Sequence, residues 1–142
     1  SRIEEMAAES GQAADALKDA EKRLADMAVL IKNVSTFQKT KPAYDAYRKA
    51  RNKDSYRAAH EREIILHEAA AKALKAAGVS KLPNLTALQS EYEKLQEQKE
   101  ALYADYGKLK KKVREYDIIK QNIDSILQAD RQPEREKGTE RG

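Results

Sequence analysis

The chain has 142 residues, of which 28 are Lys or Arg and 24 are Asp or Glu, and its formal net charge is +4. It contains no apolar run near the roughly 20 residues that a membrane-spanning helix needs, and no signal-peptide core. The absence of cysteine excludes disulfides and thiolate metal sites, and it fits a reducing cytoplasm. Because the sequence opens with Ser1 and Arg2 instead of Met, we expect a piece of a longer protein.

The composition leaves two classes open. Ala, Glu, Lys, Leu and Arg make up more than half of the chain, which is typical of long helices and coiled coils when a repeat of about 3.5 residues accompanies them. Leu, Ile, Val and Phe are scarce, as in disordered chains, but disorder also requires a high net charge, which this chain lacks. Periodicity therefore decides between a helical and a disordered protein.

The first predicted element is a helix over residues 3–36. Apolar or small residues recur there at alternating steps of three and four: Ile3, Met6, Ser10, Ala13, Leu17, Ala20, Leu24, Met27, Ile31 and Val34. Such spacing, held for four heptads, is typical of the contact line of a coiled coil, here called the seam.

Two shorter helices are predicted next, over residues 42–52 and 54–77. Pro42 is expected in the first turn of the former, where proline is tolerated, and Asp54 is expected to cap the latter. Gly78 marks the end of the second helix. Its inner face is predicted to carry Tyr56, His60, Ile64, His67, Ala71 and Leu74.

The last predicted helix covers residues 84–128, with Asn84 as its cap. Its seam runs through Leu88, Tyr92, Leu95, Lys99, Leu102, Tyr106, Leu109, Val113, Tyr116, Lys120, Ile123 and Leu127. The lysines at seam positions 99 and 120 either specify the register of pairing or extend their stems to water.

Neither long helix can bury its seam alone, so we predict an all-α fold: a long antiparallel coiled-coil hairpin. Val34 is expected near Leu88, and Ile3 towards Ile123. The two shorter helices form a head, residues 42–77, at the closed end. Residues 130–142 alternate in charge and are predicted to be a disordered tail.

No catalytic motif, metal site or cofactor site is predicted. His60 and His67 lie two helical turns apart, about 10 Å, which is too far to share one ion through bonds of about 2 Å. We interpret them as partly buried histidines with hydrogen bonds at a helix interface.

Charge points to a candidate nucleic-acid surface. Between Lys39 and Arg62, eight basic residues face three acidic ones, and three tyrosines are interleaved with them. Lys and Arg side chains that bind phosphates release counterions from the nucleic acid, and tyrosine rings stack on unpaired nucleobases. The candidate residues are Lys39, Lys41, Tyr44, Tyr47, Arg48, Lys49, Arg51, Lys53 and Arg57. The alternative interpretation is that the tyrosines anchor the head while the charges are merely solvated.

A second basic cluster follows on the last helix. It consists of Lys108, Lys110, Lys111, Lys112 and Arg114. Consecutive residues point around a helix, so we expect most of these side chains to face water.

Five short segments add a family resemblance. In chain order they are Tyr44–Ala50, Ile65–Ala70, Lys81–Pro83, Leu88–Tyr92 and Ile119–Asp124. Together, over roughly residues 21–127, they resemble the C-terminal helical region of relaxases, the mobilisation nucleases of conjugative and mobilisable elements in Firmicutes. Relaxases nick DNA with a tyrosine and a histidine-held metal in an N-terminal domain, and this chain has only two histidines.

The resemblance implies a non-catalytic accessory module of a bacterial cytoplasmic relaxase. It would bind single-stranded or origin DNA, or dock relaxosome or coupling proteins. Two alternatives stay open: a coiled-coil interaction or oligomerisation module, including a homodimer, and a rigid spacer.

Overall fold

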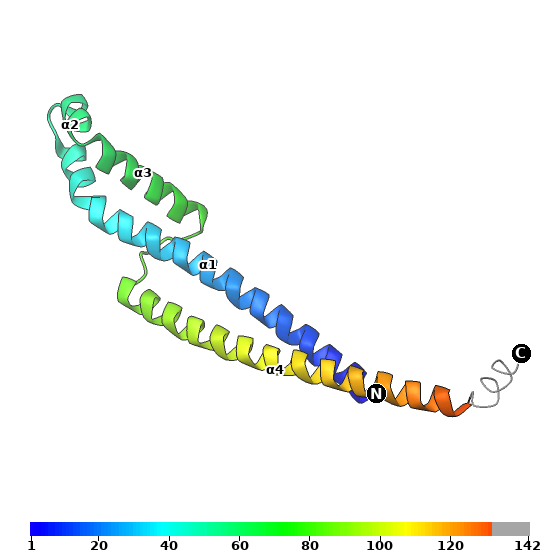
Figure 1. Ribbon diagram of the computed structural model, residues 1–142. Coiled ribbons are helices and arrows are strands. Elements are labelled where there is room, and N and C mark those ends of the chain that lie inside the picture. The colour runs from blue at the N-terminus through cyan, green and yellow to red at the C-terminus, as the bar shows by residue number, and fades with distance from the viewer. Residues whose placement is uncertain (132–142) are drawn as a thin grey trace, which may run out of the picture. The chain divides into compact units, whose positions relative to one another are not determined.

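The computed structural model describes residues 1–131. They form four α-helices and no strand, which confirms the all-α prediction (Figure 1). The helices are α1 (Arg2–Lys49), α2 (Lys53–Ala59), α3 (Glu61–Ala76) and α4 (Leu85–Arg131). The predicted charged tail lies outside the described residues, except for its first two positions, 130 and 131, which end α4. Within the described residues, no helix combines the length and apolarity that crossing a membrane requires.

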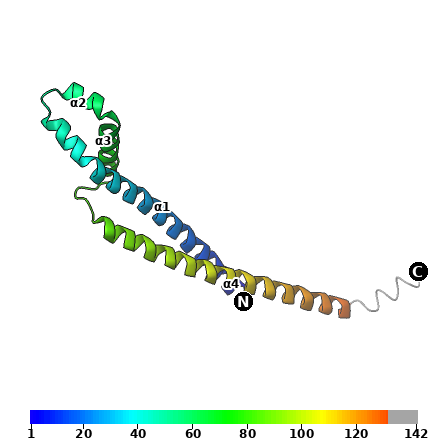
Figure 2. The same cartoon turned by 60° about the vertical axis from the view of Figure 1, so that its left-hand side comes forward.

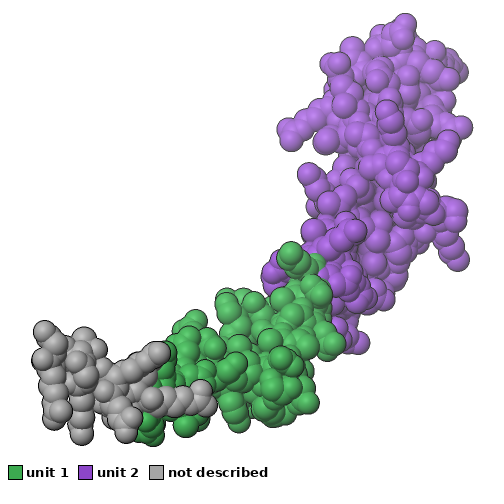
Figure 3. Space-filling view, turned by 90° about the vertical axis from the view of Figure 1, so that its right-hand side faces the viewer, with its two compact units in different colours: residues 1–18, 100–142 green, residues 19–99 purple. Residues whose placement is uncertain are grey.

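The chain divides into two compact units, coloured separately in Figure 3. One comprises Asp19–Lys99, and the other comprises Ser1–Lys18 together with Glu100–Gly142. The long helices α1 and α4 each contribute to both units.

In the unit of residues 19–99, α1 and α4 pack side by side as the predicted helical hairpin (Figures 1 and 2). Val34 packs with Leu88, and farther along, the Glu21 carboxylate lies 3.9 Å from the Lys99 ammonium. From the first contact to the second, the residue numbers fall along α1 and rise along α4, so the two helices are antiparallel. The Lys99 side chain therefore extends from the seam to a partner on α1, as expected of a long stem with a charged end.

The core of this unit joins α1, α3 and α4. Val34, Leu74 and Leu88 are buried in one cluster. Six partly buried residues pack against it: Leu30, Ile31, Phe37, Val79, Leu82 and Leu85. The segment between α3 and α4 thus contributes to the same core as the helices that it connects.

The predicted break before Pro42 is wrong, because α1 continues through this proline to Lys49. An interior proline costs a helix roughly 3 kcal/mol, since it removes a hydrogen bond and crowds the preceding turn. Contacts beyond the proline oppose this cost. Tyr44, beyond the proline, stacks on His67 of α3. The first shorter helix of the prediction is therefore the end of α1.

The second shorter helix is also revised, since residues 54–77 are divided at His60 into α2 and α3. Asn52, not Asp54, caps α2: its side-chain oxygen accepts the backbone N–H of Ser55 at 3.0 Å. Asn and Asp are nearly equivalent as caps, so residue type alone does not choose between neighbouring candidates.

The predicted ends around the α3–α4 connection are confirmed. Gly78 has a φ of +78°, directly after the end of α3. The N–H of Gly78 donates to the carbonyl of Lys75, and that of Val79 to the carbonyl of Leu74, both at 3.0 Å. This pair of bonds is the Schellman motif, in which glycine adopts the left-handed conformation without penalty. Asn84 caps α4 by accepting the N–H of Ala87 at 2.9 Å.

In the other unit, the seam is buried over only part of its predicted length. Met6 and Leu17 of α1 are buried, and the seam residues of α4 are half-buried as far as Val113. Beyond it the seam residues of α4 are exposed, and α4 runs past the first residues of α1 (Figures 1 and 2). The predicted approach of Ile3 to Ile123 is therefore wrong, since Ile123 is 51% exposed.

Candidate nucleic-acid interface

Four basic residues gather where α1 ends and α2 begins. We call Arg48, Lys49, Arg51 and Lys53 the basic tip. All four are exposed, and no acidic residue interrupts them in the sequence. None of them forms an ion pair within residues 1–131, and the same holds for exposed Lys39. Arg48 and Lys49 also occupy the last turn of α1, where cations are favoured by the helix dipole.

Two other candidate cations are already paired. The Lys41 ammonium donates to the Asp45 carboxylate at 2.8 Å, and this hydrogen bond lowers the pKa of Asp45. The Arg57 guanidinium donates to the Glu68 carboxylate at 2.6 Å, which raises the pKa of Arg57. Both pairs are largely exposed, so they neutralise charge locally without fixing the fold.

The three tyrosines between these bases are half-buried and stacked. Tyr44 lies 4.4 Å from the His67 ring, at an interplanar angle of 20°. Tyr56 stacks on His60 at 4.3 Å and faces Tyr47 at 6.5 Å. The Arg57 guanidinium lies 5.7 Å from the centre of the Tyr47 ring. These contacts occupy ring faces, so they support the interpretation of the tyrosines as anchors of the head more than as base-stacking residues.

His67 lies at the interface of α3 with α1, where it is only 4% exposed. The Thr40 hydroxyl donates to the carbonyl of Thr36 at 2.7 Å. The same hydroxyl is hydrogen-bonded with Nδ1 of His67, which lies 2.9 Å away. Burial lowers the pKa of His67, because desolvation disfavours the charged ring. For His67 this confirms the interpretation of a partly buried histidine with a hydrogen bond at a helix interface.

His60 has a different environment. It joins α2 to α3, its side chain is 41% exposed, and its Nδ1 lies 3.9 Å from a carboxylate oxygen of Glu63. Among residues 1–131, no group of three or more His, Cys, Asp or Glu side chains is arranged to hold a metal ion.

The second basic cluster lies on α4, in the unit that contains Glu100–Gly142. All five of its side chains are exposed, as predicted. The Lys110 ammonium lies 5.3 Å from the centre of the Tyr106 ring, a cation–π distance.

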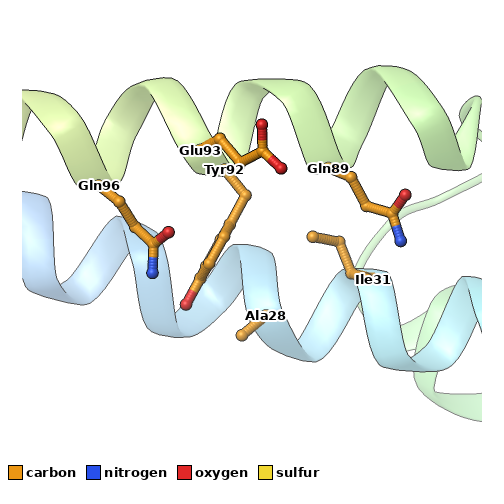
Figure 4. A pocket seen from close by; sticks show the side chains of 6 residues that line it. All are labelled: Ala28, Ile31, Gln89, Tyr92, Glu93 and Gln96. Carbon is orange, nitrogen blue, oxygen red and sulfur yellow. The ribbon is translucent and has the colours of Figure 1, made fainter.

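An open groove of about 590 Å³ lies between α1 and α4 (Figure 4). The Tyr92 ring extends from α4 towards Ala28, whose small side chain leaves the space. Six residues line the groove: Ala28, Ile31, Gln89, Tyr92, Glu93 and Gln96. The lining combines one charged residue, Glu93, with amide, aromatic and aliphatic side chains.

Sequence reasoning did not single out Thr40 or Phe37, the α1 partners of His67. Phe37 lies 4.4 Å from the His67 ring. The signal was present, because residues 37, 40 and 44 follow helical steps of three and four and share one face. Assigning Pro42 to a helix start interrupted that pattern.

No protein-family model, no curated protein and no solved structure matches this chain.

Proposed function

We propose that this chain is a non-catalytic DNA-binding accessory module that contacts phosphates through the basic tip. The observation that supports it is the set of exposed cations at the end of α1 and the start of α2, which have no ion-pair partner in the described residues. Unpaired surface cations are the groups that neutralise phosphates and release counterions. Cations already held by carboxylates, such as Arg57, contribute less.

Phosphate contact is favoured over stacking of unpaired bases, because the ring faces of Tyr44, Tyr47 and Tyr56 are engaged within the head. Binding through phosphates is independent of sequence. We therefore expect both duplex and single-stranded DNA to bind, and we expect little discrimination among sequences.

The relaxase resemblance remains a prediction, and it is the reason for choosing DNA over other polyanions. On that basis the ligand would be DNA near an origin of transfer. Relaxosome and coupling proteins of a bacterial cytoplasm would then be the neighbouring partners.

Fluorescence anisotropy with labelled duplex and single-stranded oligonucleotides tests this proposal. The triple variant Arg48→Glu, Lys49→Glu, Arg51→Glu reverses the charge of the tip. If four to five phosphates are contacted, log K should fall with log salt at a slope of about −4 for duplex DNA, and the variant should flatten this slope.

A matched control distinguishes the tip from general positive charge. The variant Lys110→Glu, Lys111→Glu, Lys112→Glu changes the net charge equally, but on exposed positions of α4. Only the tip variant should weaken binding and flatten the salt slope. Equal losses in both variants, or no binding at about 50 mM salt, would contradict the proposal.

A second candidate function is a coiled-coil interaction module. It is supported by large apolar side chains that remain exposed on α4. A rigid spacer, the third alternative, predicts that neither DNA nor a protein partner binds.

A further inference from the structure

Exposed apolar side chains are concentrated near the C-terminal end of α4. Ten large hydrophobic residues are exposed in the described part of the chain, and six of them lie between positions 116 and 127. These six, between 41% and 62% exposed, are Tyr116, Ile118, Ile119, Ile123, Ile126 and Leu127. Exposed apolar side chains that share one face of a helix can mark an interaction site.

Five of the six share one face of the helix. At 100° per residue, Tyr116, Ile119, Ile123, Ile126 and Leu127 fall within an arc of about 100°, whereas Ile118 points elsewhere. We call these five residues the α4 stripe. An arc of that width is the contact face of a helix that packs against another helix.

The α4 stripe continues an interface that already exists in the same unit. Tyr106, Leu109 and Val113 are half-buried on α4, and the same three-and-four spacing leads from them to Tyr116 and Ile123. Figures 1 and 2 show α4 continuing past the first residues of α1. The seam therefore extends along α4 beyond the part that α1 covers.

We propose that the α4 stripe packs against the α4 stripe of a second copy of this chain, in antiparallel orientation. A two-fold axis makes such an interface self-complementary, because the same surface serves both partners. The dimer would extend the hairpin seam by helix–helix packing of the same kind, with isoleucines from both copies filling the contact.

Charge at the edge of the stripe selects the orientation. Lys120 lies there together with Asp117 and Asp124. In an antiparallel pair centred between positions 120 and 123, each lysine lies beside Asp124 of the other copy. In a parallel pair the two lysines would stand in the same layer and repel each other.

Sedimentation equilibrium of the full chain, from about 5 to about 500 µM, tests the association. We expect a monomer–dimer equilibrium. Ile123→Glu with Ile126→Glu should weaken it by at least about 100-fold, because charges would be buried. The matched control, Ile65→Glu with Leu66→Glu, alters exposed residues of α3 and should leave the dimer unchanged. A monomer at every concentration, or equal losses in both variants, would overturn the proposal.

Cross-linking tests the orientation, and the chain offers a background without cysteine. Tyr116→Cys and Leu127→Cys face each other across an antiparallel pair. A mixture of the two variants should therefore form the mixed disulfide, while neither variant alone should cross-link efficiently. Disulfides formed by each variant with itself would indicate a parallel dimer and overturn the antiparallel arrangement.

Discussion

The Nδ1 atom of His67 lies 2.9 Å from the Oγ1 atom of Thr40, and this hydrogen bond joins α3 to α1. Both side chains are buried, and the His67 ring is enclosed by Phe37 and Tyr44. The contact therefore links the sequence before Pro42 with a helix that begins about 20 residues later.

Stability should fall as the pH drops below the ordinary histidine value. Burial lowers the pKa of His67 from 6.5 in the folded chain, so the unfolded chain takes up a proton more readily. The free energy of unfolding should be maximal above about pH 6.5 and decrease towards the folded-state pKa, by at most about 1.4 kcal/mol per pH unit. Urea unfolding followed by circular dichroism between about pH 7.5 and 5.5 measures this slope.

The charged groups that act on the pKa of His67 are Asp45, Lys41 and Glu68. His67→Phe should flatten the slope, because it removes the buried ionisable ring. His60→Phe, at a ring that is 41% exposed, is the matched control. An unchanged slope in His67→Phe would show that another group is responsible.

Thr40→Val should destabilise the chain more than Thr40→Ser. Valine matches threonine in shape but leaves the buried Nδ1 of His67 without its hydrogen-bond partner on Thr40, at a cost of about 1–3 kcal/mol. Serine keeps the hydroxyl and loses one methyl group, worth about 0.8 kcal/mol. Thermal unfolding of the two variants decides the order. A Val variant as stable as the Ser variant would mean that the hydrogen bond contributes little.

The sequence predicted what depends on local chemistry. Gly78 and Asn84 were assigned correctly because a left-handed residue and a side-chain cap are decided within a few residues. The pairing of Val34 with Leu88 was also predictable, since two seams of matching period bury their apolar residues when they pack against each other.

What the sequence did not predict depends on tertiary contacts. Pro42 signals a break, yet contacts of Tyr44 with α3 support the helix beyond it. Periodicity likewise shows that residues 116–127 form an apolar face, but not whether a partner helix covers it. The stacking of Tyr47 on Tyr56 joins α1 to α2 across a turn, and no local sequence pattern predicts it.

Adjacent isoleucines of α3 give an internal comparison for core packing. Ile64 is fully buried, whereas Ile65 is 48% exposed. Ile64→Ala should cost about 2–5 kcal/mol, because it removes buried methyl groups and leaves a cavity. Ile65→Ala should cost about 1 kcal/mol or less. Both substitutions change helix propensity equally, so the difference measured by urea unfolding reports burial alone. Equal losses would show that α3 presents a different face to α1.

Two glycines should respond to alanine with opposite signs. Gly107 lies inside α4, and a Cβ added there meets no atom within 4 Å. Gly107→Ala should therefore stabilise the chain by about 1 kcal/mol through helix propensity alone. Gly78 also has open space, but its φ of +78° is the left-handed region, where a side chain costs about 1–2 kcal/mol. Gly78→Ala should consequently lower the melting temperature, while Gly107→Ala should raise it. If both substitutions shifted the melting temperature in the same direction, then either α4 would not be continuous at position 107 or Gly78 would not adopt the left-handed conformation after α3.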